Sequence, residues 1–259
     1  MPNHNHHMFV ANWKMNMPLS KALAFSQEHA EELLRISNAT SHAIVLCPIF
    51  PALYPLAQQF RNSPIKISAQ SCSQYPSGAY TGEVDAQSLA EAGCSYCIVG
   101  HSERRLYFNE TPATVADKTE RLIEQNLQPI ICIGETSHDY EKKKTHLVLE
   151  SQLAPIFNML EKFSNQSFSL TFAYEPVWSI GTGITPDSSY LKDIFGWLYS
   201  LMRSNIAQNT RTRLIYGGSV DERTAHVMRS ISYLEGFLIG GASLDFKKFK
   251  NIVLLDSKE

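Results

Sequence analysis

A single carboxylate, Glu175, follows an apolar stretch that ends near Ala173, and it directly precedes a segment built like a hinged lid. Pro176 fixes the direction in which the chain continues, whereas Gly181 and Gly183 let backbone N–H groups approach an anion closely. A carboxylate base coupled to a closing loop indicates proton abstraction in a site that excludes water. By itself, the segment is equally compatible with an exposed Glu followed by an ordinary loop.

Polar side chains also stand at the ends of two other apolar stretches. Because residues two apart in a strand point the same way, Asn12 and Lys14 are expected on the face of Val10, and His101 on the face of Val99. Taken singly, Asn12 could cap a turn, Lys14 could extend to solvent, and His101 could be a buried imidazole. Together with Glu175, they predict polar groups that converge at the carboxyl ends of parallel strands.

Two glycine-rich segments, 216–220 and 240–244, follow the last two predicted strands. A lone Gly-Gly indicates only a tight turn. Barrels of alternating strands and helices commonly bind phosphate with the loops in these places, through backbone N–H groups. Two such loops on neighbouring strands, with glycines in the lid, therefore predict a phosphate-binding cradle.

Eight alternations of strand and helix position these groups. The pattern predicts strands over 9–13, 43–47, 65–69, 96–99, 129–133, 169–173, 214–216 and 236–239. It predicts helices over 19–34, 52–60, 85–92, 112–126, 144–163, 188–206, 222–229 and 246–253. No linker divides them, so we expect an α/β chain with one eight-stranded parallel (β/α)8 barrel over 8–259, preceded by a disordered His-rich leader over 1–7.

Composition narrows the class of protein further. With 44% hydrophobic and 19% charged residues and a net charge of −2, the chain is expected to be globular, with neither nucleic acid nor a membrane as partner. It shows no apolar run near the ~20 residues of a membrane span and no secretory signal pattern. Five cysteines, an odd number, suit the reducing cytoplasm better than a disulfide framework.

The chain resembles the triosephosphate isomerase family from Met8 onward. The resemblance rests on the strings Ala11–Asn16 and Val99–Arg105, on the lid segment that begins at Glu175, and on the pair of Gly-Gly loops. It implies interconversion of dihydroxyacetone phosphate and D-glyceraldehyde 3-phosphate through an enediolate, in glycolysis and gluconeogenesis. It implies no metal or organic cofactor.

The resemblance also implies catalytic roles. Glu175 would be the base, and His101 would donate to the substrate oxygens as a neutral imidazole. Lys14 and Asn12 would stabilise the developing oxyanion. Residues behind these groups would hold them in place, namely Glu103, Ser102 and Cys132.

Binding residues follow from the same resemblance. The phosphorylated triose would contact Asn12, Lys14, Gly181, Ser219, Gly240 and Gly241. The lid would consist of Pro176, Val177, Trp178, Ser179, Ile180, Gly181, Thr182, Gly183, Ile184, Thr185 and Pro186. Binding energy from the phosphate would close this lid over the base.

A homodimer is implied by the loop over 75–83. Thr81 matches the family's residue that reaches the partner's active site, and Arg104 would brace the subunit contact. The alternative is a surface loop that packs only on itself.

The chain departs from the family at four places. Ser71 stands where Asn is usual, Ser179 where Ala is usual, and Ile184 where Lys is common, and Pro186 falls in the trailing hinge of the lid. These departures bear on lid kinetics and dimer tightness rather than on the type of reaction.

Two other classes of protein remain open from the residues alone. A retaining glycoside hydrolase would need two carboxylates about 5 Å apart, for which Glu103 and Glu175 are candidates. A non-catalytic binding protein on the same fold would not require Asn12, Lys14, His101 and Glu175 together.

Overall fold

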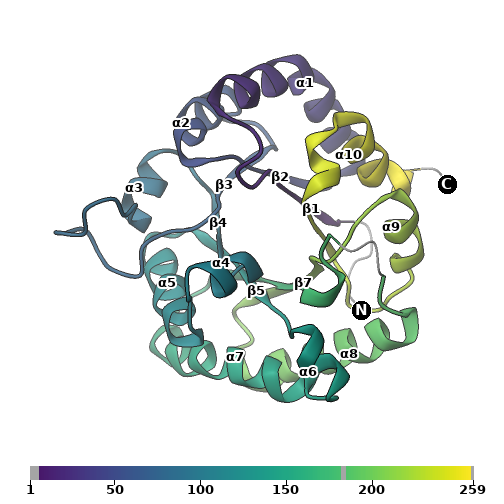
Figure 1. Ribbon diagram of the computed structural model, residues 1–259. Helices are drawn as coiled ribbons and strands as arrows, with labels where there is room; N and C mark the ends of the chain where they lie inside the picture. The colour runs from purple at the N-terminus through teal and green to yellow at the C-terminus, as the bar shows by residue number, and fades with distance from the viewer. Residues whose placement is uncertain (1–5, 182–184, 258–259) are drawn as a thin grey trace.

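The computed structural model describes residues 6–181 and 185–257 and forms a closed barrel of eight parallel strands in sequence order, surrounded by helices (Figure 1). The strands are β1 (Met8–Asn12), β2 (Ala43–Cys47), β3 (Lys66–Ala69), β4 (Tyr96–Val99), β5 (Gln128–Ile133), β6 (Ser169–Tyr174), β7 (Arg211–Tyr216) and β8 (Gly236–Ile239). The predicted fold class and all eight predicted strands are confirmed.

Ten α-helices lie in the described part of the chain, mostly outside the barrel. They are α1 (Leu19–Thr40), α2 (Phe50–Gln59), α3 (Ala86–Glu91), α4 (Ser102–Tyr107), α5 (Pro112–Glu124), α6 (Ser137–Glu141), α7 (Thr145–Leu160), α8 (Ser188–Asn205), α9 (Glu222–Met228) and α10 (Phe246–Val253). Short 3₁₀ turns are η1 (Glu161–Phe163), η2 (Val177–Ser179), η3 (Gly241–Leu244) and η4 (Leu254–Ser257).

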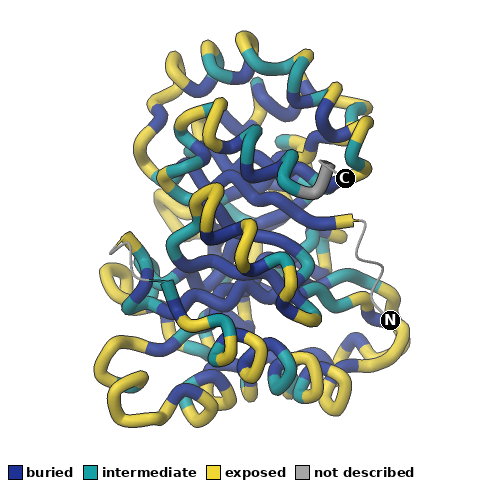
Figure 2. Tube along the Cα trace, turned by 90° about the vertical axis from the view of Figure 1, so that its right-hand side faces the viewer, coloured by how far each residue is buried: buried dark blue, intermediate teal, exposed yellow. Residues whose placement is uncertain are grey.

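Alternation along each strand produces two cores, one inside the barrel and one between the strands and the helices. The cluster inside the barrel includes Val10, Val45, Ile98 and Cys132. The neighbouring strand residues Phe9, Leu46, Val99 and Ile131 belong to the outer cluster, between the strands and the helices. Figure 2 shows the strands as a buried centre with exposed positions on the outer side of the helices. Inward-facing side chains just beyond the carboxyl ends of the strands therefore gather at one rim of the barrel.

The N-terminal edge differs from the prediction. The structure does not describe residues 1–5 of the expected leader, but His7 is only 8% exposed. Its backbone N–H donates to His42 Nδ1 over 3.3 Å, and its carbonyl accepts from Ala43 N–H over 2.9 Å. His7 therefore extends the pairing of β1 with β2.

The longest excursion from the barrel is the loop between β3 and α3, which projects sideways in Figure 1. Every residue over 75–83 is exposed, and the rings of Tyr75 and Tyr80 stack with centroids 4.3 Å apart. Among the described residues, no helix has the length and apolar character needed to cross a membrane.

Candidate active site

Glu175 lies one residue beyond β6 and is held by strand pairing that continues past the strand. Its N–H donates to the carbonyl of Ile133 over 2.7 Å, and the residue is 1% exposed. Carboxylate Oε2 accepts the backbone N–H of Ser102 over 3.0 Å. A Cβ at Gly217 would lie 2.9 Å from Glu175 Cγ, so glycine is required for this close approach.

His101 reaches the same rim by a route that simple alternation does not predict. Ile98 belongs to the inner cluster and Val99 to the outer one, so the predicted shared face of His101 and Val99 is wrong. Gly100 between them adopts φ 67°, a left-handed conformation that redirects the chain. His101 consequently becomes the N-cap of α4 instead of the next residue of β4.

The cap determines which ring nitrogen of His101 carries the proton. Nδ1 accepts the backbone N–H of Glu103 over 3.2 Å, so in a neutral ring the hydrogen is assigned to Nε2. Nε2 lies 3.3 Å from Glu175 Oε1. The capped imidazole therefore presents its N–H toward the carboxylate and the neighbouring cavity.

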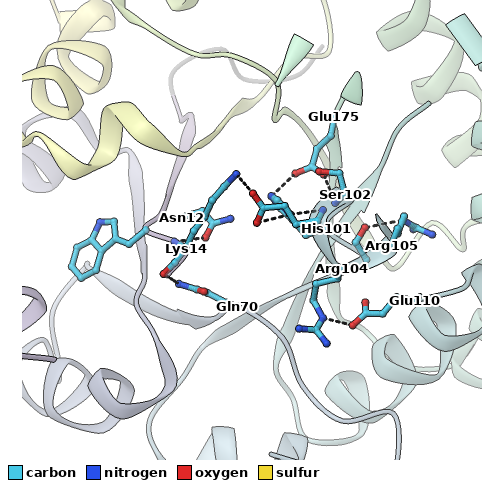
Figure 3. Close-up of polar contacts among 12 residues, drawn as sticks. Asn12, Lys14, Gln70, His101, Ser102, Arg104, Arg105, Glu110 and Glu175 are labelled. Atoms are coloured by element: carbon cyan, nitrogen blue, oxygen red, sulfur yellow. Dashed lines mark hydrogen bonds and ion pairs between the residues drawn. The ribbon is translucent and has the colours of Figure 1, made fainter. Parts of the chain in front are cut away.

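Lys14 stands beyond β1 in a conformation unusual for a residue other than glycine, with φ 51°. Its N–H donates to Asn12 Oδ1 over 3.1 Å, which holds the strained turn, and its ammonium donates to Glu103 Oε1 over 2.5 Å. Figure 3 shows Asn12, Lys14, His101 and Glu175 brought together at the rim. Glu103, expected to hold Lys14 or Asn12 in place, contacts Lys14 in the structure.

Two supporting residues were missed by sequence reasoning. Gln70 Nε2 donates to the carbonyls of Lys14 and Cys47, both over 2.9 Å, and so pins the loop after β1 (Figure 3). Arg105 donates to the carbonyls of Gly100 over 2.8 Å and Cys132 over 3.0 Å. Gln70 could have been found from the sequence, because it directly follows β3 and so stands at the same rim as the predicted catalytic residues.

Cys132 lies inside the barrel beneath Glu175. Burial raises the pKa of its thiol, and the nearby Glu175 charge raises it further. The thiol therefore stays protonated and uncharged next to the carboxylate.

A cavity of about 260 Å³ lies in front of these groups. It is lined by Asn12, Lys14, His101, Glu175, Ile180, Gly181, Gly217, Gly218, Ser219, Val220, Leu238, Gly240, Gly241 and Ala242. The structure thus gathers all four predicted catalytic residues and all predicted phosphate-binding residues around one cavity. The three residues predicted to hold the catalytic groups in place, Ser102, Glu103 and Cys132, are not part of the cavity lining and lie behind it.

The leading part of the predicted lid, Pro176–Gly181, is tied to the loop after β7. Ser219 Oγ donates to the carbonyl of Ser179 and accepts the N–H of Gly181 over 3.2 Å. The Ser179 hydroxyl lies 3.2 Å from the hydroxyl of Tyr216. Residues 182–184 lie outside the described part of the chain, while Pro186 on the trailing side is buried.

Trp178, in η2, is anchored to Glu135, a fully buried carboxylate after β5. Trp178 Nε1 donates to Glu135 Oε1 over 2.7 Å, and the hydroxyls of Tyr174 and Tyr190 reach the same carboxylate. Burial raises the pKa of Glu135, and the hydrogen bonds from these donors only partly offset that rise. Nothing in the local sequence pattern indicated this anchor.

The predicted dimer residues lie outside the cavity lining. Thr81 is exposed on the projecting loop. Arg104 forms an ion pair with the buried Glu110 (Figure 3). Its guanidinium also lies over the Phe108 ring, 4.7 Å from the centroid. Lys118 also donates to Glu110 and to Ser71 Oγ, so an all-polar cluster underlies this surface.

Known proteins match the chain along nearly its whole length. The triosephosphate isomerase family model matches residues 7–255. Triosephosphate isomerase of Endomicrobium trichonymphae is 37% identical over 254 residues, which cover 95% of this chain and 97% of the relative. Those of Clostridium botulinum (strain Loch Maree / Type A3) and Aquifex aeolicus (strain VF5) are 37% and 34% identical over 248 residues, with 95% of this chain and 98% of each relative covered. The chain belongs to the triosephosphate isomerase family.

Proposed function

We propose that this chain interconverts dihydroxyacetone phosphate and D-glyceraldehyde 3-phosphate, as an enzyme of glycolysis and gluconeogenesis. The observation that carries the proposal is the pairing of the Glu175 carboxylate with His101 Nε2, 3.3 Å apart, at a cavity edged by two Gly-Gly loops. The reaction needs a base for a C–H proton, a donor for two oxygens and a cradle for a phosphate. This cavity offers a group for each need.

In the proposed mechanism, Glu175 removes the proton next to the substrate carbonyl and returns it to the neighbouring carbon through an enediolate. Its Oε2 accepts the Ser102 N–H in the structure, so the carboxylate must leave that bond to reach a substrate carbon. Movement of the lid over the cavity would then exclude water from the base.

His101 donates its Nε2–H to the substrate oxygens as a neutral imidazole. The Glu103 N–H at Nδ1 supports this assignment, because a second ring proton would displace that bond. Lys14 places a positive charge at the same oxygens, and the Asn12 amide adds a donor. Preorganised donors of this kind are worth roughly 3 kcal/mol each in a transition state.

The phosphate is held by backbone N–H groups of Gly181, Ser219, Gly240 and Gly241. Gly240 is close to Lys14, since a Cβ built on it would lie 3.6 Å from Lys14 Cε, so ammonium and cradle act on the same anion. The Gly181 N–H donates to Ser219 Oγ in the structure, so this hydrogen bond must break before the same N–H can donate to the phosphate. Lid movement and phosphate recognition are coupled in this way.

Glycoside hydrolysis is disfavoured by the surroundings of the second carboxylate. Glu103 is paired with the Lys14 ammonium, and the His101 ring contacts Glu103 Oε2 through Nδ1 at 3.7 Å and Glu175 Oε1 through Nε2 at 3.3 Å. An imidazole thus occupies the space that a sugar ring would need.

A direct assay separates the three classes of function. The purified chain should convert dihydroxyacetone phosphate to glyceraldehyde 3-phosphate and leave an aryl β-glycoside intact. Glycoside cleavage without isomerisation would favour the hydrolase, and absence of both activities in a folded sample would favour the binding protein.

We further propose a cytoplasmic homodimer formed through the loop over 75–83. The exposure of the whole loop, including Thr81, supports this, and so does the exposed ring of Phe108 under Arg104. All five cysteines are buried and free, as suits a reducing compartment.

A further inference from the structure

Tyr140, on the short helix α6, contacts the lid from the side away from the substrate cavity. Its ring stacks on that of Trp178 with centroids 4.3 Å apart and an interplanar angle of 26°. Tyr140 does not line the cavity, and its contact with Trp178 is made by the ring. The stack therefore acts on the lid and not on the substrate.

Trp178 is held on two sides by different means. Its indole N–H donates to the buried carboxylate of Glu135, and one face of its ring lies against Tyr140. Tyr140 also meets Tyr190 edge to face, with centroids 5.4 Å apart, and Tyr190 donates to Glu135. A capping box between Thr136 and residue 139 fixes the start of α6 and so the position of Tyr140.

The position of Trp178 is linked to that of the proposed base, three residues earlier. Glu175 Oε2 accepts the Ser102 N–H, and the segment after it is tied down because Val177 N–H donates to the carbonyl of Glu135 over 3.1 Å. The backbone at Glu175 and at Val177 is therefore held in place while η2 keeps this position. The withdrawn carboxylate and the stacked indole are therefore parts of one arrangement.

We propose that Tyr140 is a positioning residue that stabilises the withdrawn arrangement of Glu175 by stacking on Trp178. The inference rests on the proposed function, since it assigns Tyr140 a role in that reaction's lid. A ligand that requires the other arrangement must break the stack, and its affinity is lowered accordingly. Since an offset aromatic pair is worth about 0.5–1.5 kcal/mol, the effect should be about two- to tenfold.

The test is the dissociation constant of 2-phosphoglycolate, measured by titration calorimetry. The carboxylate and phosphate of this anion mimic the enediolate and the phosphate of the proposed intermediate. Tyr140→Ala should bind it about two- to tenfold more tightly than the unchanged chain. Tyr140→Leu should show a smaller change in the same direction. Tyr140→Phe should keep the affinity of the unchanged chain because it retains the ring.

A matched control removes an aromatic stack elsewhere. Tyr199 stacks on Tyr233 with centroids 4.0 Å apart, on α8 and away from the cavity lining. Tyr199→Ala should lose comparable thermal stability without changing the affinity for 2-phosphoglycolate. A purely structural role for Tyr140 would make the two alanine variants behave alike.

Protein labelled with 5-fluorotryptophan provides the signature of the lid. Its Trp178 resonance, assigned from Trp178→Phe, should move to the ligand-bound position at lower 2-phosphoglycolate concentration in Tyr140→Ala than in Tyr199→Ala. Equal or weaker binding by Tyr140→Ala would overturn the inference while wild-type isomerisation stands. Failure of the wild-type chain to isomerise triose phosphate would instead overturn the proposed function.

Discussion

At the scale of single residues, a chain of polar contacts links Lys14, Glu103, His101 and Glu175. The ammonium of Lys14 neutralises Glu103, whose backbone N–H in turn fills Nδ1 of His101. Nε2 then faces Glu175. The proposed base, the proposed electrophilic donor and the cation are therefore positioned by one another as well as by the strands that carry them.

Shortening the Glu175 side chain tests whether the position of its carboxylate matters for the rate. Glu175→Asp keeps the carboxylate but withdraws it by one methylene, and misplacement of about 1 Å can cost on the order of a hundredfold in rate. We expect kcat to fall by about that factor while the circular dichroism spectrum stays unchanged. Wild-type turnover in the folded variant would exclude Glu175 as the base.

Removing the cation should affect binding and turnover together. Lys14→Met leaves the side-chain volume similar but removes the charge that faces an anionic substrate, so kcat/KM should fall by on the order of a hundredfold or more. Lys247→Met, an exposed lysine on α10, is the control and should behave like the unchanged chain. Similar kinetics for the two variants would mean that the Lys14 charge takes no part in the reaction.

At the scale of elements, the barrel edge near α4 and α5 depends on a buried ion cluster. Burial favours the neutral form of Glu110, but bonds and charges from Lys118 and Arg104 outweigh it and lower its pKa. A lowered carboxylate pKa stabilises the fold fully above pH 4.5, the ordinary value for glutamate, and this contribution is lost as pH falls through the folded-state pKa.

Glu110→Gln should therefore destabilise the chain in a pH-dependent way. It leaves Lys118 buried without its carboxylate, which costs about 3–5 kcal/mol at pH 7. The difference from wild type, measured by urea unfolding at one protein concentration, should shrink as the pH is lowered below 4.5. Glu124→Gln, which breaks the more exposed pair with Arg121, should cost less than about 1 kcal/mol. A pH-independent loss in Glu110→Gln would contradict the charge argument.

The same elements show what could be predicted from the sequence. Strands such as β4 and β8 were predicted to the residue because apolar runs mark them. Helices α4 and α6 were missed because neither buries a residue, so neither has the apolar periodicity that identifies a helix. His101 was assigned to the correct rim by the wrong reasoning, because the positive φ of Gly100 breaks the alternation.

The supporting residues of the site were harder to predict than the reacting groups. Glu135, Gln70 and Tyr216 contact the lid or the loop after β1 from distant parts of the sequence. Their roles depend on which loops meet at the rim, and that arrangement follows from closure of the barrel instead of from any local pattern. The resemblance to a known family supplied the proposed reacting residues but not these anchors.

At the scale of the whole molecule, the loop over 75–83 projects away from an otherwise closed barrel. A long exposed loop with stacked tyrosines is expensive to order unless it packs against something. A second copy of the chain is the proposed partner, with Thr81 reaching toward the site of that copy.

Sedimentation equilibrium at micromolar concentration should give twice the 29.2 kDa mass of the chain. Thr81→Arg should shift the equilibrium toward monomer and reduce activity in proportion, because charge and bulk are placed at the contact. A tetramer would be compatible with such dimers, whereas a fully active monomer would contradict both the interface and the role of Thr81.

The fate of the transferred proton gives the most direct test of the proposed reaction. Dihydroxyacetone phosphate is incubated with the purified chain in D₂O, and the products are observed by ¹H NMR. We predict glyceraldehyde 3-phosphate that carries deuterium at C2, since a carboxylate base exchanges its proton with solvent, and we predict a large loss of this activity in Glu175→Gln. Equal rates for Glu175→Gln and the unchanged chain, or no conversion by a folded wild-type sample, would contradict the central claim.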